Sequence, residues 1–131
     1  MNYKDEGELK ASLDEWVQIL HLEAWEIHTF IRRRRDIPDK QAEGYTSYSF
    51  ERRMTDILLL DPMDYDDASF AQDMEQTLVH ELMHLVLEVL TPENKESLEY
   101  VMLEQIVDSL ATTLVKLKRG GEKSPENKEL K

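Results

Sequence analysis

Two histidines four residues apart, with a glutamate directly after the first, stand in the most apolar segment of the chain, Thr77–Leu90, "TLVHELMHLVLEVL". Residues four apart lie one above the other on a helix, so His80 and His84 can point at one ion. The pattern HExxH on a helix is typical of zinc sites, with both histidines as ligands and Glu81 beside the open coordination position. Zinc lowers the pKa of bound water to about 7, and the glutamate accepts the proton as that water attacks a carbonyl. The spacing therefore predicts a site for metal-assisted hydrolysis.

The helix that carries this motif is expected to run from about Phe70 to Leu90. Successive residues turn by about 100° on a helix, so the polar side chains that follow Gln76 share one narrow sector. Leu, Val and Met fill the rest of the circumference. This distribution predicts a largely buried helix whose polar stripe lines a cleft, and such a context favours a metal site over a chance match. The alternative is a set of ordinary polar residues on a solvent-exposed stripe of the helix.

A catalytic zinc ion takes three protein ligands and leaves one position open. No histidine follows His84 and the chain has no cysteine, so the third ligand must be sought among the carboxylates of the last helix. Glu104 comes twenty residues after His84, and Asp108 follows one turn later. Both also suit the border of a plain amphipathic helix, so they become candidates only because the motif needs a partner. Glu96 and Glu99 are weaker alternatives because their connection back to the motif helix is short.

The pairing of "HELMH" with "ExxxD" on a following helix resembles the gluzincin metallopeptidases, the thermolysin-like branch of the zincins. The resemblance implies that Glu104 is the third zinc ligand and that Asp108 orients His80 by a hydrogen bond. The order of strands, motif helix and ligand helix is also similar to that of small phage- and prophage-type metallopeptidases. The similarity covers about residues 25–117, within which only HExxH is specific.

The hydrophobic pattern predicts an α+β fold, which the resemblance narrows to a minimal zincin-like domain. Its expected parts are an N-terminal helix, a small three-stranded, mostly antiparallel sheet, an active-site helix and a C-terminal ligand helix. The expected ranges are a helix over about 8–20, strands over about 25–31, 45–51 and 55–60 with a turn near Arg52–Arg53, and a last helix from Thr91-Pro92-Glu93 to about Lys118. Gly120-Gly121 is expected to stop that helix, so that residues 1–118 form one domain and 119–131 a flexible charged tail.

The net charge of −12 argues against a general nucleic-acid binder, because phosphate contacts need clustered Lys and Arg. The one basic run, Arg32–Arg35, is interpreted as a solvated strand end that offsets surplus acid. From Met54 to Asn94 there is no Lys or Arg, so the surroundings of the motif are expected to attract cations. The charged N-terminus and the lack of a long apolar run predict a cytoplasmic protein without a membrane helix.

Two features depart from the family that the motif resembles. Thermolysin-like enzymes carry a second subdomain whose His or Tyr stabilises the oxyanion, and we expect none here. His21 and His28 lie before the motif, near and within the first expected strand, and are expected to be structural or exposed. By analogy with zincins, the strand Thr55–Leu60 or a neighbour is expected to offer a free edge to a peptide. Four tyrosines stay open as oxyanion donors: Tyr45, Tyr48, Tyr65 and Tyr100.

These observations favour a zinc-dependent peptidase that acts on a peptide or protein, with Glu81 as general base and one zinc ion per chain. The first alternative is a phage accessory-type interaction module that binds metal with the same fold but does not catalyse. The second is a purely structural α+β domain in which the motif is accidental. Two imidazoles and a carboxylate also suit iron or manganese, and the oligomeric state is left open.

Overall fold

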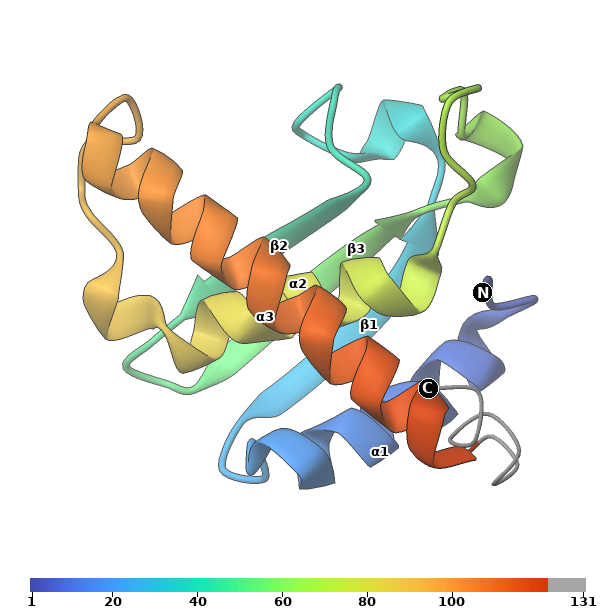
Figure 1. Cartoon of the computed structure of the whole chain (residues 1–131), viewed down its shortest axis with the longest axis horizontal. Coiled ribbons are helices and arrows are strands. Elements are labelled where there is room, and N and C mark those ends of the chain that lie inside the picture. Colours follow the sequence, from blue (N-terminus) through green and yellow to red (C-terminus); the bar gives the residue numbers. More distant parts are fainter. Residues whose placement is uncertain (123–131) are drawn as a thin grey trace, which may run out of the picture. The chain divides into compact units, whose positions relative to one another are not determined.

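The computed structural model describes residues 1–122, and its helices and strands make an α+β fold, as predicted (Figure 1). In chain order they are α1 (Glu6–Leu20), β1 (Glu26–Arg32), β2 (Gly44–Ser49), β3 (Met54–Leu60), α2 (Met74–Val86) and α3 (Leu98–Glu122). The chain divides into two compact units, Met1–Leu82 and Met83 onward, with the division inside α2. The single domain expected over residues 1–118 remains a prediction.

The three strands form one sheet in the order β1-β3-β2. A tight turn joins β2 to β3, which therefore pair antiparallel, and Arg53 takes a positive φ of 52° in that turn near the position predicted for it. β1 pairs with β3 in parallel, because residues 33–43 and then β2 return the chain before β3 begins. The sheet is thus mixed, with one parallel and one antiparallel pair, where mostly antiparallel pairing was expected.

β3 is the central strand, so of the strands expected to offer a free edge, Thr55–Leu60 itself has none, whereas its neighbours do. Its backbone is bonded to β1 on one side and to β2 on the other. Thr55, Ile57 and Leu59 alternate on one buried face, and Leu60 is buried as well. The opposite face carries the exposed Met54 and Asp56, so β3 is bonded on both sides but is buried on one face of the sheet. The free edges among the described residues belong to β1 and β2.

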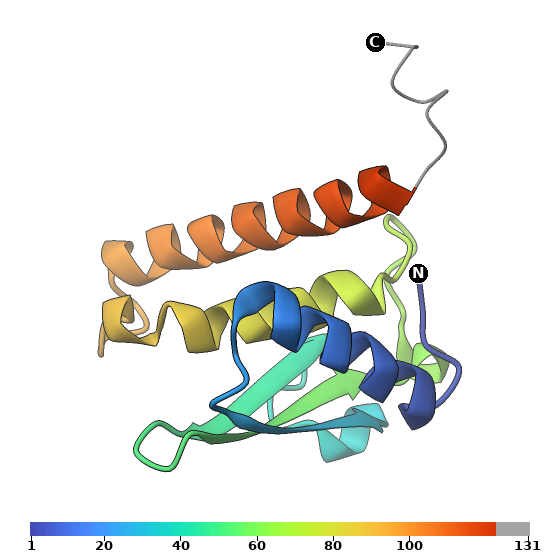
Figure 2. The same cartoon turned by 90° about the horizontal axis from the view of Figure 1, so that it is seen from below.

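Within the first unit, α1 and the beginning of α2 cover the same face of the sheet (Figure 2). The side chain of Asp5 caps α1 by accepting a hydrogen bond from the backbone N–H of Glu8 at 2.9 Å, so the helix begins two residues before the predicted start. The indole N–H of Trp16 donates to the buried carboxylate of Glu75 on α2 at 3.0 Å. The apolar core of this unit comes from both helices and β3: Leu9, Leu13, Trp16, Ile57, Leu59, Leu78, Val79 and Leu82.

The motif helix is shorter than predicted at both ends. Asp73 is its cap, since its carboxylate accepts from the N–H of Gln76 at 3.1 Å, and the residues from Phe70 to Gln72 stay outside. At its C-terminal end α2 stops at Val86, and a short 3-10 turn, Glu88–Leu90, follows. An apolar pattern alone does not mark these ends, because Phe70, Val89 and Leu90 continue it while lying exposed outside the helix.

The last helix begins at Leu98, so the predicted start at Thr91-Pro92-Glu93 is wrong. Ser97 provides the cap: its hydroxyl accepts from the N–H of Tyr100 at 3.1 Å. Thr91 instead closes the preceding 3-10 turn through its N–H and the carbonyl of Glu88. Both sites offer a Thr or Ser cap, and the preceding turn decides between them.

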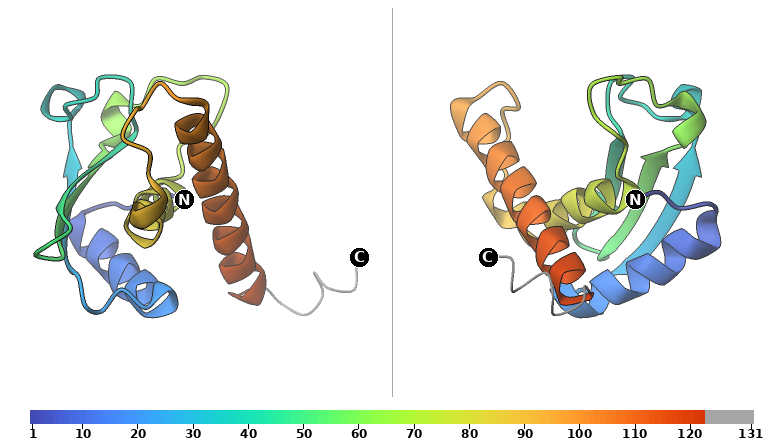
Figure 3. Two further views of the ribbon diagram at one scale, coloured as in Figure 1. Left: turned by 90° about the vertical axis from the view of Figure 1, so that its left-hand side faces the viewer. Right: turned by 45° about the vertical axis from the view of Figure 1, so that its right-hand side comes forward.

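In the second unit, α3 is one uninterrupted helix (Figure 3). It continues through Gly120 and Gly121 to Glu122, so the predicted stop at the glycine pair is also wrong; glycine weakens a helix by about 1 kcal/mol without forbidding it. The rest of the predicted tail, residues 123–131, lies outside the described residues. No helix within residues 1–122 combines the length and the apolar character needed to cross a membrane.

The basic run at the end of β1 is solvated and paired with acids, as predicted. Arg32 lies 3.0 Å from the Glu6 carboxylate, and Arg33 forms a two-point ion pair with Asp64. The Arg33 guanidinium, together with the backbone N–H of Arg34, lowers the pKa of the Asp64 carboxyl to about 2. These arginines therefore tie the strand end to neighbouring loops.

Candidate metal centre

The motif lies on a buried helix, as its apolar surroundings predicted. Leu78, Val79 and Leu82 are completely buried, whereas His80 and His84 are partly exposed. Glu81 is buried, with 8% of its surface accessible. A helix with this distribution keeps its backbone fixed by packing while two imidazoles reach the surface. Such a scaffold holds side chains in place for binding.

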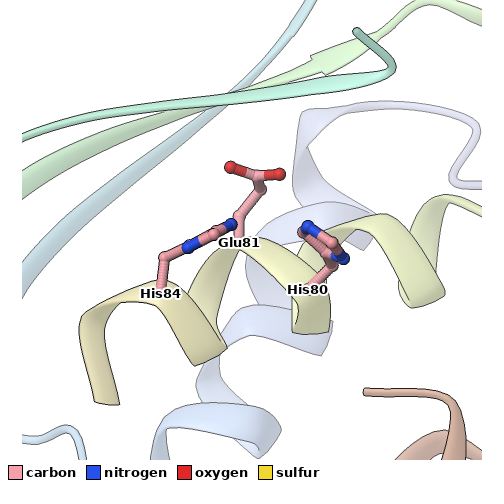
Figure 4. A group of neighbouring side chains, drawn as sticks. All are labelled: His80, Glu81 and His84. Atoms are coloured by element: carbon pink, nitrogen blue, oxygen red, sulfur yellow. The ribbon is translucent and has the colours of Figure 1, made fainter. Parts of the chain in front are cut away.

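His80, Glu81 and His84 each offer a metal-ligating atom, and these atoms all lie within 4.8 Å of one another. Figure 4 shows the three side chains on one side of α2, with the Glu81 carboxylate reaching toward the strands. Two ligand atoms of a tetrahedral zinc ion stand about 3.3 Å apart, given bond lengths of about 2.0–2.1 Å. Rotation about the side-chain bonds of two partly exposed histidines can close the remaining difference. The donor set therefore fits a divalent cation.

Glu104 reaches the motif from α3. Its Oε1 lies 3.2 Å from Nε2 of His84, and both side chains are partly exposed. That separation matches the spacing of two ligand atoms on one zinc ion, and it equally matches a hydrogen bond between carboxylate and imidazole. The sequence spacing of twenty residues did not by itself predict this contact, and α3 begins six residues later than predicted. The structure thus places Glu104 beside one of the two predicted histidine ligands, and the complete predicted ligand set remains a prediction.

Two residues near Glu81 were not singled out from the sequence. The hydroxyl of Thr46 on β2 donates a hydrogen bond to Oε1 of Glu81 at 2.5 Å. Gly44 begins the same strand, and a Cβ atom there would stand only 2.6 Å from Cγ2 of Thr77 and 3.1 Å from Oε2 of Glu81. Glycine at this point lets the strand approach the motif helix. A glycine inside a strand pattern often marks such a close approach, and this was the available sequence signal.

Other candidates lie elsewhere in the fold. His21 is exposed at the C-terminal end of α1, and His28 on β1 lies 2.8 Å from the carboxylate of Glu26. Glu96 is exposed in the loop before α3, and Glu99 is exposed in its first turn. Within residues 1–122 the group of ligand-type side chains that lie close enough for a metal is His80, Glu81 and His84, so it contains neither these four residues nor Glu104. Asp108 is exposed one turn beyond Glu104, and its predicted role toward His80 remains a prediction.

The tyrosines considered as oxyanion donors have various environments. Tyr65 donates its hydroxyl to the carbonyl of Phe70 at 2.7 Å. The ring of Tyr48 packs edge-on against Trp25 with centroids 6.5 Å apart. Tyr45 and Tyr100 are half-buried on β2 and α3. None of these positions selects an oxyanion donor, so that role stays open.

Comparisons with protein-family models, with curated proteins and with solved structures found no match to this chain. The case for a function therefore rests on the residues themselves. Two imidazoles and one buried carboxylate beside them form a group that could hold a metal ion, and within the second unit Glu104 lies 3.2 Å from one of these imidazoles, that of His84. No Lys or Arg occurs between Met54 and Asn94, the stretch that contains the motif, so the local charge favours a cation.

Proposed function

We propose that this chain is a zinc-dependent peptidase in which His80, His84 and Glu104 hold one zinc ion and Glu81 is the general base. The observation that carries the proposal is the convergence of His80, Glu81 and His84 within 4.8 Å on one face of a buried helix. The contact between Glu104 and His84 supports the same ligand set. The substrate class is a peptide or protein, and the proposed location is cytoplasmic.

A bound zinc ion supplies a Lewis acid that polarises a water molecule and the carbonyl of the scissile bond. The chain supplies the base. The Thr46 hydroxyl donates a hydrogen bond to Oε1 of Glu81. In this proposal the other carboxylate oxygen, Oε2, accepts the proton from the attacking water. Oxygen adds to the carbonyl carbon, the C–N bond breaks, and Glu81 passes the proton to the leaving amine. In this scheme Gly44 keeps the space beside Oε2 clear, since a side chain would stand 3.1 Å from it.

A second function draws support from the same hydrogen bond. Glu81 is buried and its carboxylate is held by Thr46 at 2.5 Å, an arrangement that also suits a fixed structural acid. The chain would then be a metal-binding interaction module without catalysis, of the phage accessory type. Zinc binding at one ion per chain without turnover on any peptide is the result that selects this function.

The test combines metal content with turnover on a peptide library. Wild-type protein, stripped of metal and dialysed against zinc, is expected to retain one ion per chain. Glu81→Gln is expected to keep that ion and to lose hydrolysis by about 10²- to 10⁴-fold, the usual contribution of a general base. His80→Ala is expected to lose both.

His28→Ala is the matched control, because His28 is an exposed histidine on β1, outside the proposed site. It should retain full metal content and full turnover. If the folded wild-type protein binds no zinc, both functions are contradicted, and the remaining hypothesis is a purely structural α+β domain. Cleavage by Glu81→Gln at the wild-type rate removes Glu81 as the base while keeping the metal site.

A further inference from the structure

A row of exposed apolar side chains runs along α3. It consists of Met102, Ile106, Leu110 and Leu117, whose accessible surface fractions are 52%, 50%, 38% and 68% in that order. The spacing of four, four and seven residues keeps them on one side of the helix. We call this set the α3 stripe. A solvent-facing helix surface is normally polar, so an apolar row interrupted only by the exposed Thr113 indicates a surface that another element covers.

The α3 stripe is distinct from the buried side of the same helix. Leu103, Val107, Ala111 and Val115 form the buried row and are 0–6% accessible. The first three stripe residues each precede a buried residue by one position, so the two rows are different faces of α3. The two rows therefore differ in exposure, and the α3 stripe is the more accessible of them.

Charge is segregated along α3. The half from Leu98 to Asp108 contains Glu99, Glu104 and Asp108 and no Lys or Arg. The half from Ser109 to Glu122 contains Lys116, Lys118 and Arg119 and a single acid, the terminal Glu122. A helix with this pattern is complementary to itself when reversed, because each acidic half then faces a basic half. In a parallel pair, like charges would face each other and repel.

We infer that the α3 stripe is the interface of a homodimer in which a second copy of the chain packs its own α3 antiparallel against it. Placing Glu99 of one copy opposite Lys116 of the other brings Ile106 close to the two-fold axis. Both of these charged residues are exposed and border the stripe. The arrangement is isologous: the same patch serves on both copies, as in most homodimers.

Each chain carries a net charge of −12, so two chains repel at long range, and the local acid-to-base match must overcome that repulsion. Salt at about 0.1 M screens charges more than about 10 Å apart and affects close pairs less, so association should persist at moderate ionic strength. The inference uses α3 alone and does not depend on metal or catalysis.

The first test is sedimentation velocity of the whole chain over a series of concentrations. The wild type is expected to show a monomer–dimer equilibrium. Ile106→Lys is expected to raise the dissociation constant by about tenfold or more, as is usual for a residue at the centre of an interface. Gln105→Lys is the matched control: it places the same charge one residue away on an exposed position outside the stripe, and it should leave the constant unchanged. Circular dichroism establishes that both variants are folded.

The second test uses charge reversal to read the orientation. Glu99→Lys alone and Lys116→Glu alone each place like charges opposite one another twice, so each should weaken the dimer. The double variant Glu99→Lys/Lys116→Glu keeps the wild-type net charge and should recover the wild-type dissociation constant. Weakening by each single reversal together with recovery in the double variant requires the antiparallel orientation. In a parallel pair, like charges face each other in the wild type and in every variant, so the single reversals would not weaken the dimer.

Several results would overturn the inference. A wild-type chain that stays monomeric at the highest concentration means that the α3 stripe is covered by a different partner, such as a basic helix of another protein. A dimer that is unaffected by Ile106→Lys uses another surface. A dimer that loses stability with the two single reversals and does not recover in the double variant is not antiparallel.

Discussion

Two clusters of ionisable side chains in the chain differ in the groups that they bring together. At the end of β1, Asp64 accepts two hydrogen bonds from Arg33, at 2.7 and 2.9 Å, and one from the N–H of Arg34 at 2.7 Å. An acid meets bases there, and the contact is neutral without any further ion. It lies at the surface, where such pairs contribute little to stability.

On α2, the groups that converge are all of the metal-ligating type. His80, Glu81 and His84 bring two imidazoles and a carboxylate within 4.8 Å, in a stretch of the chain that has no Lys or Arg. The comparison teaches that clustering of charge alone does not identify a site. What distinguishes the second cluster is that its donor atoms are suited to one common cation, on a helix that packing holds fixed.

The largest effect that would sharpen this comparison is expected from Glu104→Gln. If Glu104 is the third ligand, the zinc affinity should fall by more than about 100-fold, since loss of a group that only orients a ligand already costs about 10- to 100-fold. Competition with a chelating dye measures the affinity. Glu99→Gln, an exposed acid on the same helix, is the control and should bind zinc like the wild type. Loss of affinity in Glu99→Gln in place of Glu104→Gln would transfer the ligand role to Glu99.

Gly44→Ala tests whether the close approach of β2 to α2, beside the second cluster, stabilises the fold. A Cβ atom there would overlap Cγ2 of Thr77 at 2.6 Å, so we expect a loss of about 1–3 kcal/mol in the free energy of unfolding. Thr77→Ser removes that methyl group and keeps the hydroxyl that donates to the carbonyl of Asp73. Urea unfolding of both single variants and of the double variant gives their coupling. If the losses in the free energy of unfolding of the two single variants simply add in the double variant, the overlap with Thr77 is not what destabilises Gly44→Ala.

Thr46→Val is expected to reduce stability less than Gly44→Ala does, and to lower turnover because Glu81 loses its hydrogen-bond donor. The substitution keeps the shape of the side chain but removes the donor to Glu81, whose buried carboxylate loses a partner at a cost of about 1–2 kcal/mol. Thr46→Ser retains the hydroxyl and should restore both stability and turnover. Ser47→Val, at an exposed position next on the strand, controls for added apolar surface. Equal stability of Thr46→Val and wild type would mean that the hydrogen bond does not hold Glu81.

The smallest effect belongs to the ion-paired cluster and appears as a pH dependence. The folded chain holds the pKa of Asp64 at about 2, below the ordinary value of 3.8, chiefly through the hydrogen bond with Arg33. Its contribution to stability is present above about pH 4 and is lost as the pH falls toward about 2. Asp64→Asn should therefore be slightly less stable than the wild type near neutral pH, and the two should converge in acid. Thermal unfolding across this range measures the difference, and parallel curves would contradict it.

Local pattern was sufficient for several elements. The helical period predicted α1 to within two residues, and the turn near Arg52–Arg53 was predicted because two short apolar runs flank it. The placement of His80 and His84 on one side of a buried helix follows from their spacing of four alone. Helix ends were predicted less well, because caps such as Asp73 and Ser97 compete with other Ser, Thr and Asp residues nearby.

Long-range contacts could not be read from the pattern. Nothing in "GYTSYS" identifies the edge strand of the sheet, or Thr46 as the donor to Glu81, since 35 residues separate the two. The periodicity of α3 likewise shows two neighbouring apolar rows without telling which is buried. Such choices depend on which surfaces meet in three dimensions, and many arrangements share the same local pattern.

By itself, the amino-acid sequence determined the pair of imidazoles on one helical turn, the acidic surroundings and the α+β class, because these follow from helix geometry, composition and local hydrophobic period. Only the tertiary structure decided that β3 lies between β1 and β2, that Glu104 reaches His84 at 3.2 Å, and that Gly44 lets a strand carry Thr46 to Glu81. The physical reason is that these contacts join residues far apart in the chain, and packing of whole elements fixes them together.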